Sequence, residues 1–122
     1  MIEVKSVTKK FGSFTAVDNI SFTVENSSIY GLIGYNGAGK TTLLKTASGM
    51  YRPDGGKVLL DGENAYDNSE IRTGLFYIPD DMYFMGNSTV EGMARFYSGM
   101  YESFDMKLFE KIKEKLGDVD II

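Results

Sequence analysis

The sequence predicts an α/β fold, and three features of the chain support this prediction. Polar and apolar residues alternate near the N-terminus, as they do in half-buried strands. A glycine-rich stretch, GYNGAGKTT at 34–42, joins a short apolar run to a helical pattern. Apolar residues then recur at helical spacing in the last third of the chain. We therefore expect antiparallel strands and a glycine-loop core over roughly residues 1–85, and helices over roughly 86–122.

The expected strands are of two kinds. Alternating polarity over 2–5 and 20–24 predicts two antiparallel strands, connected through KKFGSFTAVDN at 9–19. Two apolar runs without alternation, IYGLIG at 29–34 and GLFYIP at 74–79, have the pattern of central strands that are buried on both faces. The core sheet should therefore include both runs.

A helix is expected to begin at Lys40, directly after the glycine-rich stretch, and to end at Gly49. Its apolar face comprises Leu43, Leu44 and Ala47. The following RPDGG has the composition of a turn. KVLLDG then predicts a strand that ends in a turn at Asp61 and Gly62.

Two further helices are expected near the C-terminal end. Ser88 and Glu91 have the spacing of a capping box, which predicts the start of a helix there. Its apolar residues recur at i, i+3, i+4 and i+7, namely Met93, Phe96, Tyr97 and Met100. The last helix should begin near Asp105 and end at Gly117.

Composition excludes several classes of function. The chain has 122 residues, a net charge of −4, and neither cysteine nor histidine. Disulfides, thiolate metal sites and a histidine base are therefore excluded, and its scattered lysines and arginines do not suggest a nucleic-acid partner. The sequence contains no run of roughly 20 apolar residues, the length that is needed to span a bilayer. The N-terminus lacks the pattern of a secretory signal. We expect a cytoplasmic location.

The spacing of Gly34, Gly39, Lys40 and Thr41 matches the phosphate-binding P-loop pattern. In such a loop Lys40 reaches the β and γ phosphates, Thr41 offers its hydroxyl to Mg²⁺, and Thr42 lies near the α phosphate. The backbone N–H groups that would surround the phosphates belong to Asn36, Gly37, Ala38 and Gly39. ATP and Mg²⁺ are thus the expected cofactors. The alternative, a glycine-rich turn with an incidental lysine, is disfavoured because a strand pattern precedes the loop and a helix pattern follows it.

Several segments in order resemble the nucleotide-binding domain of ATP-binding-cassette (ABC) proteins. They are VTKKFGSFTAVDNISFTV, GLIGYNGAGKTTLLK, RPDGGKVLLDG, and FYIPDD followed by NSTVEGM, and together they cover nearly the whole chain. The resemblance implies a P-loop NTPase fold of the ABC-ATPase type. It also implies an ATPase that works as a dimer with a second ATP-binding domain and drives transport through a transmembrane permease subunit. That assembly would place the chain on the inner face of the cell membrane without a span of its own.

Two single residues gain a role from this resemblance. Phe11 occupies the place of the aromatic residue that stacks on adenine; a packing role in the hairpin is the alternative. Asp80 occupies the place of the Q-loop glutamine. A carboxylate there could ligate Mg²⁺ but could not donate a hydrogen bond, and a solvent-facing acidic residue is an equal alternative.

Three elements of the family pattern are missing: the LSGGQ-type signature, the Walker B strand with its catalytic glutamate, and the switch histidine. Asp61 is no substitute, because its strand runs directly into a glycine turn. The chain is therefore expected to be an incomplete domain, the N-terminal portion of a longer ATPase. Alone it should show little or no turnover.

The main functional hypothesis is the energy-coupling ATPase of an ABC transporter, with Lys40 as its catalytic residue. Three alternatives remain open. One is a soluble ABC ATPase that acts on ribosomes or DNA, and another is a regulatory module that binds nucleotide without hydrolysis. The third is another P-loop enzyme, such as a small kinase.

Overall fold

A computed structural model describes residues 1–81 and 84–117. The chain divides into two compact units, Met1–Ile78 and Pro79–Ile122, and each is described by itself. Among the described residues, no helix is long and apolar enough to cross a membrane.

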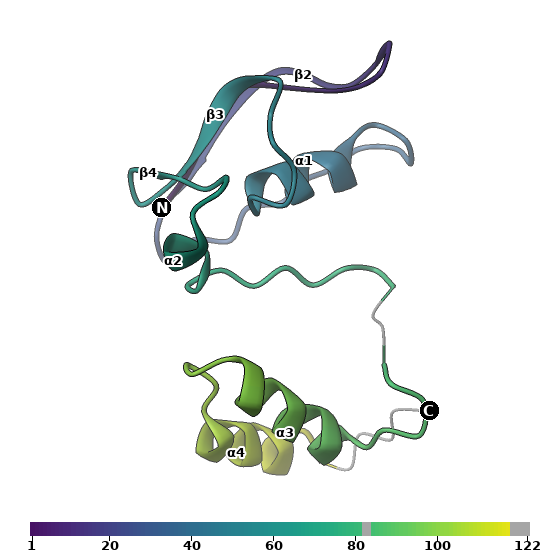
Figure 1. Ribbon diagram of the computed structural model, residues 1–122, viewed down its shortest axis with the longest axis vertical. Coiled ribbons are helices and arrows are strands. Elements are labelled where there is room, and N and C mark those ends of the chain that lie inside the picture. The colour runs from purple at the N-terminus through teal and green to yellow at the C-terminus, as the bar shows by residue number, and fades with distance from the viewer. Residues whose placement is uncertain (82–83, 118–122) are drawn as a thin grey trace. The chain divides into compact units, whose positions relative to one another are not determined.

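The first unit contains one four-stranded sheet in the order β2-β1-β3-β4, and every neighbouring pair is antiparallel. Figure 1 shows the sheet beside helix α1. Helix α1 packs against β1 and β2, and the short helix α2 follows β4. The elements are β1 (Ile2–Phe11), β2 (Phe14–Val24), α1 (Lys40–Ala47), β3 (Gly55–Leu60), β4 (Glu63–Asn64) and α2 (Ser69–Arg72).

The first hairpin confirms the predicted pairing but corrects its connection. Ile2 lies opposite Val24 and Val4 opposite Phe22, as the alternation predicts. However, the strands continue to Phe11 and Phe14, so only Gly12 and Ser13 form the turn, in place of the predicted connection over 9–19. Gly12 has a φ of 60°, which suits a tight turn.

Bulges explain why these strands are longer than the sequence pattern predicts. Both Val4 and Val7 are buried, a spacing of three that an unbroken strand cannot place on one face. Ser6 resolves this spacing with a φ of 50°, and its N–H donates to Ser21 Oγ at 2.7 Å. Since such a bulge breaks the period of two, alternation was visible only at the outer ends of the strands.

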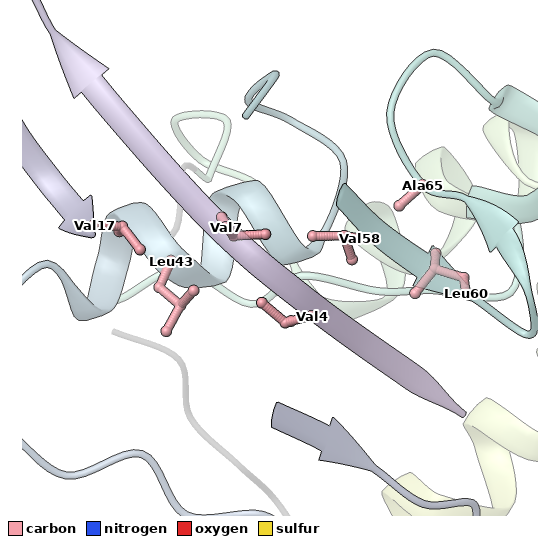
Figure 2. Packing of buried hydrophobic residues seen from close by; sticks show 7 residues of the cluster. All are labelled: Val4, Val7, Val17, Leu43, Val58, Leu60 and Ala65. Carbon is pink, nitrogen blue, oxygen red and sulfur yellow. The ribbon is translucent and has the colours of Figure 1, made fainter. Parts of the chain in front are cut away.

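The core lies between the sheet and α1, and Figure 2 shows the side chains that form it. They are Val4, Val7, Val17, Leu43, Val58, Leu60 and Ala65. On α1 the prediction was partly wrong, because Leu44 is exposed and Thr46 is buried in its place. The Thr46 hydroxyl donates to the carbonyl oxygen of Thr42 at 2.8 Å, which removes the cost of burying it.

Helix α1 ends as predicted at Gly49. The N–H of Gly49 donates to Thr46 O at 3.0 Å, and the N–H of Met50 donates to Lys45 O at 2.9 Å. These two bonds form a Schellman motif, which requires the positive φ of 76° at Gly49. The strand at 55–60 and its turn at Asp61 and Gly62 are also confirmed, and both turn residues have positive φ.

The two predicted central strands were wrong. Neither 29–34 nor 74–79 is in a strand, and side chains that should be buried are exposed, including Ile33 at 97% and Ile78 at 69%. A strand with a continuous apolar sequence requires a neighbour that accepts its hydrogen bonds. Within the described residues, the only sheet contains β1 to β4, and neither segment joins it.

The second unit contains α3 (Val90–Met100) and α4 (Met106–Leu116). The predicted capping box was wrong by one residue: Thr89 caps α3, and its hydroxyl accepts a hydrogen bond from Gly92 N at 3.0 Å. Glu91 instead forms an ion pair with Lys113 of α4, which holds the pKa of its carboxyl below the ordinary value. The limits of α4 are confirmed, with Asp105 as its N-cap and Gly117 at its end.

The apolar face predicted for α3 is only partly covered in this unit, with Met93 and Tyr97 half-buried. Phe96 is 45% exposed and Met100 is 60% exposed, whereas Ala94 is buried. The predicted helix is therefore confirmed, whereas only two of the four residues of its predicted apolar face are partly buried.

Candidate functional site

The glycine-rich loop leads directly into α1. Gly37 and Gly39 have φ values of 87° and 88°, so the loop uses two left-handed residues to turn toward the helix. Between them, the N–H of Ala38 donates to Tyr35 O at 3.1 Å and closes the turn. The loop thus has the curled backbone that the spacing predicts.

The Lys40 side chain folds back over this loop. Its ammonium group donates to the carbonyl oxygens of Gly34 and Tyr35, the latter at 2.8 Å. A Cβ at Gly34 would lie 3.5 Å from Lys40 Cδ, an ordinary van der Waals distance, so the lysine stem packs against the loop at Gly34. The structure therefore places a positive charge where the loop curls.

The N-terminus of α1 adds backbone donors to the same place. Leu43 donates the first intrahelical bond, to Gly39 O at 2.8 Å, so the N–H groups of residues 40–42 precede the helical ladder. Gly39 offers no side chain to cap them, and no acidic residue lies in the first turn. Together with the helix dipole, this end suits an anion. Thr41 lies in this turn and is exposed.

Gly39 also fixes the loop against the first hairpin. A Cβ at this position would overlap the backbone carbonyl oxygen of Ala16 in β2, so the loop and strand touch backbone to backbone. Ala16 follows Thr15, which lies opposite Lys10, and the next pair is Phe11 with Phe14. The structure thus connects the tip of the hairpin, which carries Phe11, to the loop.

Phe11 is 46% exposed and lies against a second aromatic residue. Its ring centroid is 5.7 Å from that of Tyr51, with an angle of 78° between the planes. The sequence pattern places Asp54 in the predicted RPDGG turn and assigns no role to Tyr51. The contact of Tyr51 with Phe11 and the bonds of Asp54 to β1 depend on pairing between distant segments, which leaves no local pattern in the sequence.

Asp80, the other predicted metal ligand, belongs to the second unit and is exposed. Its role stays a prediction. Among the described residues, no three acidic, histidine or cysteine side chains form a metal-binding group. In P-loop proteins Mg²⁺ binds phosphate oxygens of the nucleotide and the hydroxyl of the Ser or Thr that follows the lysine, and Thr41 is the residue predicted for that position.

A curled glycine-rich loop that follows the first hairpin and leads into a helix, with a lysine at the start of that helix, is typical of the P-loop NTPase fold. A sequence model of the ABC transporter family matches residues 17–121. The chain therefore belongs to the ABC transporter family and is part of an ATP-binding domain of that family.

Relatives with assigned names agree with this family. The chain is 42% identical over 102 residues to the probable multidrug ABC transporter ATP-binding protein YbhF of Escherichia coli (strain K12), covering 83% of this chain and 18% of that protein. It is 35% identical over 123 residues to the uncharacterized ABC transporter ATP-binding protein YybJ of Bacillus subtilis (strain 168). That match covers 100% of this chain and 50% of YybJ, so the chain spans half or less of these two relatives.

Solved structures agree as well. An ATP-binding subunit of an ABC transporter matches with a TM-score of 0.76 and 27% identity, over 91% of this chain and 46% of that one. A dimeric cassette in a post-hydrolysis state, bound to ADP and Pi, matches with a TM-score of 0.52 and 25% identity, over 60% and 34% of the two chains. The predicted fold, an incomplete domain of the ABC-ATPase type, is thereby confirmed.

Proposed function

We propose that this chain binds Mg·ATP as the P-loop portion of an ABC transporter ATPase. The observation that carries the proposal is the position of Lys40, whose ammonium group lies over the curled loop at the N-terminus of α1. A triphosphate in this loop would receive hydrogen bonds from the backbone of 36–39 and charge from Lys40. The Thr41 hydroxyl would supply one oxygen ligand to the metal.

In the whole protein this site would hydrolyse ATP and so drive transport. The relatives' names, which include a spermidine/putrescine import ATP-binding protein, support a transport role. The dimeric cassette among the structural matches supports pairing with a second ATP-binding domain. Such an assembly would work with a membrane permease, on the cytoplasmic face of the membrane.

Calorimetric titration with Mg·ATP tests the proposal. Lys40→Ala should weaken binding by about 10-fold to 100-fold, because hydrogen bonds to charged groups contribute about 1.5–3 kcal/mol. Lys57→Ala is the matched control: Lys57 is exposed on β3 of the same unit and lies outside the loop. Equal affinities of the Lys40→Ala and wild-type proteins would contradict the proposed site.

We further propose that the 122-residue chain hydrolyses ATP slowly or not at all. The chain contains no histidine and no apolar strand that ends in the carboxylates of a Walker B motif. No described group in the loop can therefore orient the attacking water. Phosphate release should stay at the background rate and be the same for wild type and Lys40→Ala. Robust turnover that Lys40→Ala abolishes would contradict this.

A further inference from the structure

The ring of Phe11 is held by contacts from two directions. Tyr51 meets it nearly at right angles, with 5.7 Å between the centroids. The Lys9 ammonium group lies over the Phe11 ring, 5.3 Å from its centroid. Almost half of the Phe11 surface nevertheless remains exposed. Such a ring is restrained and still available to a planar partner.

Asp54 ties the strand that carries Phe11 to the segment that carries Tyr51. Its Oδ2 accepts a hydrogen bond from the N–H of Lys10 at 2.7 Å and lies 3.4 Å from Lys9 Nζ. Its own N–H donates to Thr8 O at 2.8 Å. Two hydrogen bonds and one ion pair thus join the end of β1 to Asp54 of the turn.

Tyr51 is itself fixed by α1. Its N–H donates to Lys45 O at 3.3 Å, next to the Schellman motif, and Lys45 Nζ lies 5.7 Å from the Tyr51 ring centroid. Since α1 begins at the P-loop, Tyr51 links the far end of the loop's helix to the aromatic residue on the hairpin. Two contacts therefore position the Phe11 ring relative to the phosphate loop. One is the backbone contact of Gly39 with Ala16, and the other is the ring contact of Tyr51 with Phe11.

We infer that Tyr51 and Asp54 are positioning residues that hold the Phe11 ring ready to stack against the base of the nucleotide. The inference rests on the proposed function, because it concerns the base of a nucleotide whose phosphates lie in the loop. A ring already fixed in its binding position loses less conformational freedom when the ligand arrives. Without these contacts, Phe11 would still be present, but part of the stacking energy would be spent on ordering it.

The test separates the base from the phosphates by comparing two ligands. Wild type and variants are titrated with Mg·ATP and with magnesium tripolyphosphate, which has the phosphates but no base. Phe11→Ala sets the full effect of stacking: ATP should bind about 10-fold more weakly, and tripolyphosphate as before. Tyr51→Ala and Asp54→Ala should each weaken ATP binding by about 3-fold to 10-fold and leave tripolyphosphate unchanged.

Conservative variants and a double variant identify the route of the effect. Tyr51→Phe keeps the ring, and Asp54→Asn keeps an oxygen that accepts from Lys10 N–H, so both should bind ATP nearly as wild type does. Asp54→Ala in the Phe11→Ala background should cause no further loss, since its effect passes through the ring. Asp18→Ala, which removes an exposed carboxylate from the same hairpin, serves as the control.

Three outcomes would overturn the inference: unchanged ATP affinity in Tyr51→Ala and Asp54→Ala, an equal loss for both ligands, or no effect of Phe11→Ala. Failure of the proposed function looks different, because the wild-type protein would then bind neither ATP nor tripolyphosphate.

Discussion

At the scale of the residue, two glycines of the loop have nearly the same positive φ but differ in their surroundings. Gly37 and Gly39 have φ values within 1° of each other. A Cβ at Gly37 would meet nothing within 4 Å, whereas one at Gly39 would overlap the Ala16 carbonyl oxygen. The pair therefore separates the cost of a left-handed side chain from the cost of a collision.

We predict that Gly37→Ala lowers the free energy of unfolding by about 1 kcal/mol and Gly39→Ala by about 3 kcal/mol. The first value reflects the unfavourable φ alone, and the second adds displacement of the loop from β2. Urea denaturation followed by circular dichroism measures both. Equal losses would show that the loop does not press on the hairpin.

Asp54 gives a prediction for the dependence of stability on pH. The hydrogen bond from Lys10 N–H, aided by the Lys9 ammonium, holds the pKa of its carboxyl below the ordinary value, although partial desolvation opposes this shift. The unfolded pKa is about 3.9. The contribution of Asp54 to stability is therefore complete above that pKa, and it is lost as the pH falls through the lower folded pKa.

Urea unfolding of wild type and Asp54→Ala at about pH 6 and about pH 3 measures this effect. We expect wild type to be the more stable protein at the higher pH and the difference to shrink at the lower one. A difference that is the same at both values would mean that the charge on Asp54 does not contribute.

At the scale of the element, the N-cap of α4 has a simple geometry. Asp105 Oδ1 accepts hydrogen bonds from the N–H groups of Lys107 and Leu108, at 2.9 and 3.0 Å. We predict that Asp105→Ala destabilises the second unit by about 1 kcal/mol, and that Asp105→Asn, which keeps the accepting oxygen, changes little. The ellipticity at a helical wavelength during urea titration gives both values. A large loss in Asp105→Asn would assign the effect to charge and not to capping.

Elements set by local chemistry were predicted well from the sequence. The end of α1 at Gly49, both ends of α4 and the loop at 34–42 all depend on residues a few positions apart. Elements set by distant partners were not: the hairpin extended beyond its bulges, and 29–34 and 74–79 did not form strands. The same division holds in the candidate site. The P-loop was predicted from the spacing of neighbouring residues, whereas the contact of Phe11 with Tyr51 was not predicted.

At the scale of the whole molecule, the exposed apolar segment 29–34 has the largest consequence. Ile29 is 103% exposed and Ile33 is 97% exposed, and both belong to a run whose pattern is that of a buried strand. Exposed apolar residues next to backbone outside any sheet favour pairing between chains. We therefore predict that the isolated protein self-associates as its concentration rises.

Light scattering coupled to size exclusion measures this over a dilution series. Wild type should exceed the 13.6 kDa of one chain at high concentration and approach it on dilution. Ile33→Lys should remain nearer to the mass of one chain, because the added charge opposes pairing at the segment. Met50→Lys makes the same change of charge at another exposed apolar residue, outside the segment, and should associate as wild type does. A wild-type mass of 13.6 kDa at every concentration would show that the segment does not pair between chains, and equal suppression by both variants would assign association to net charge instead.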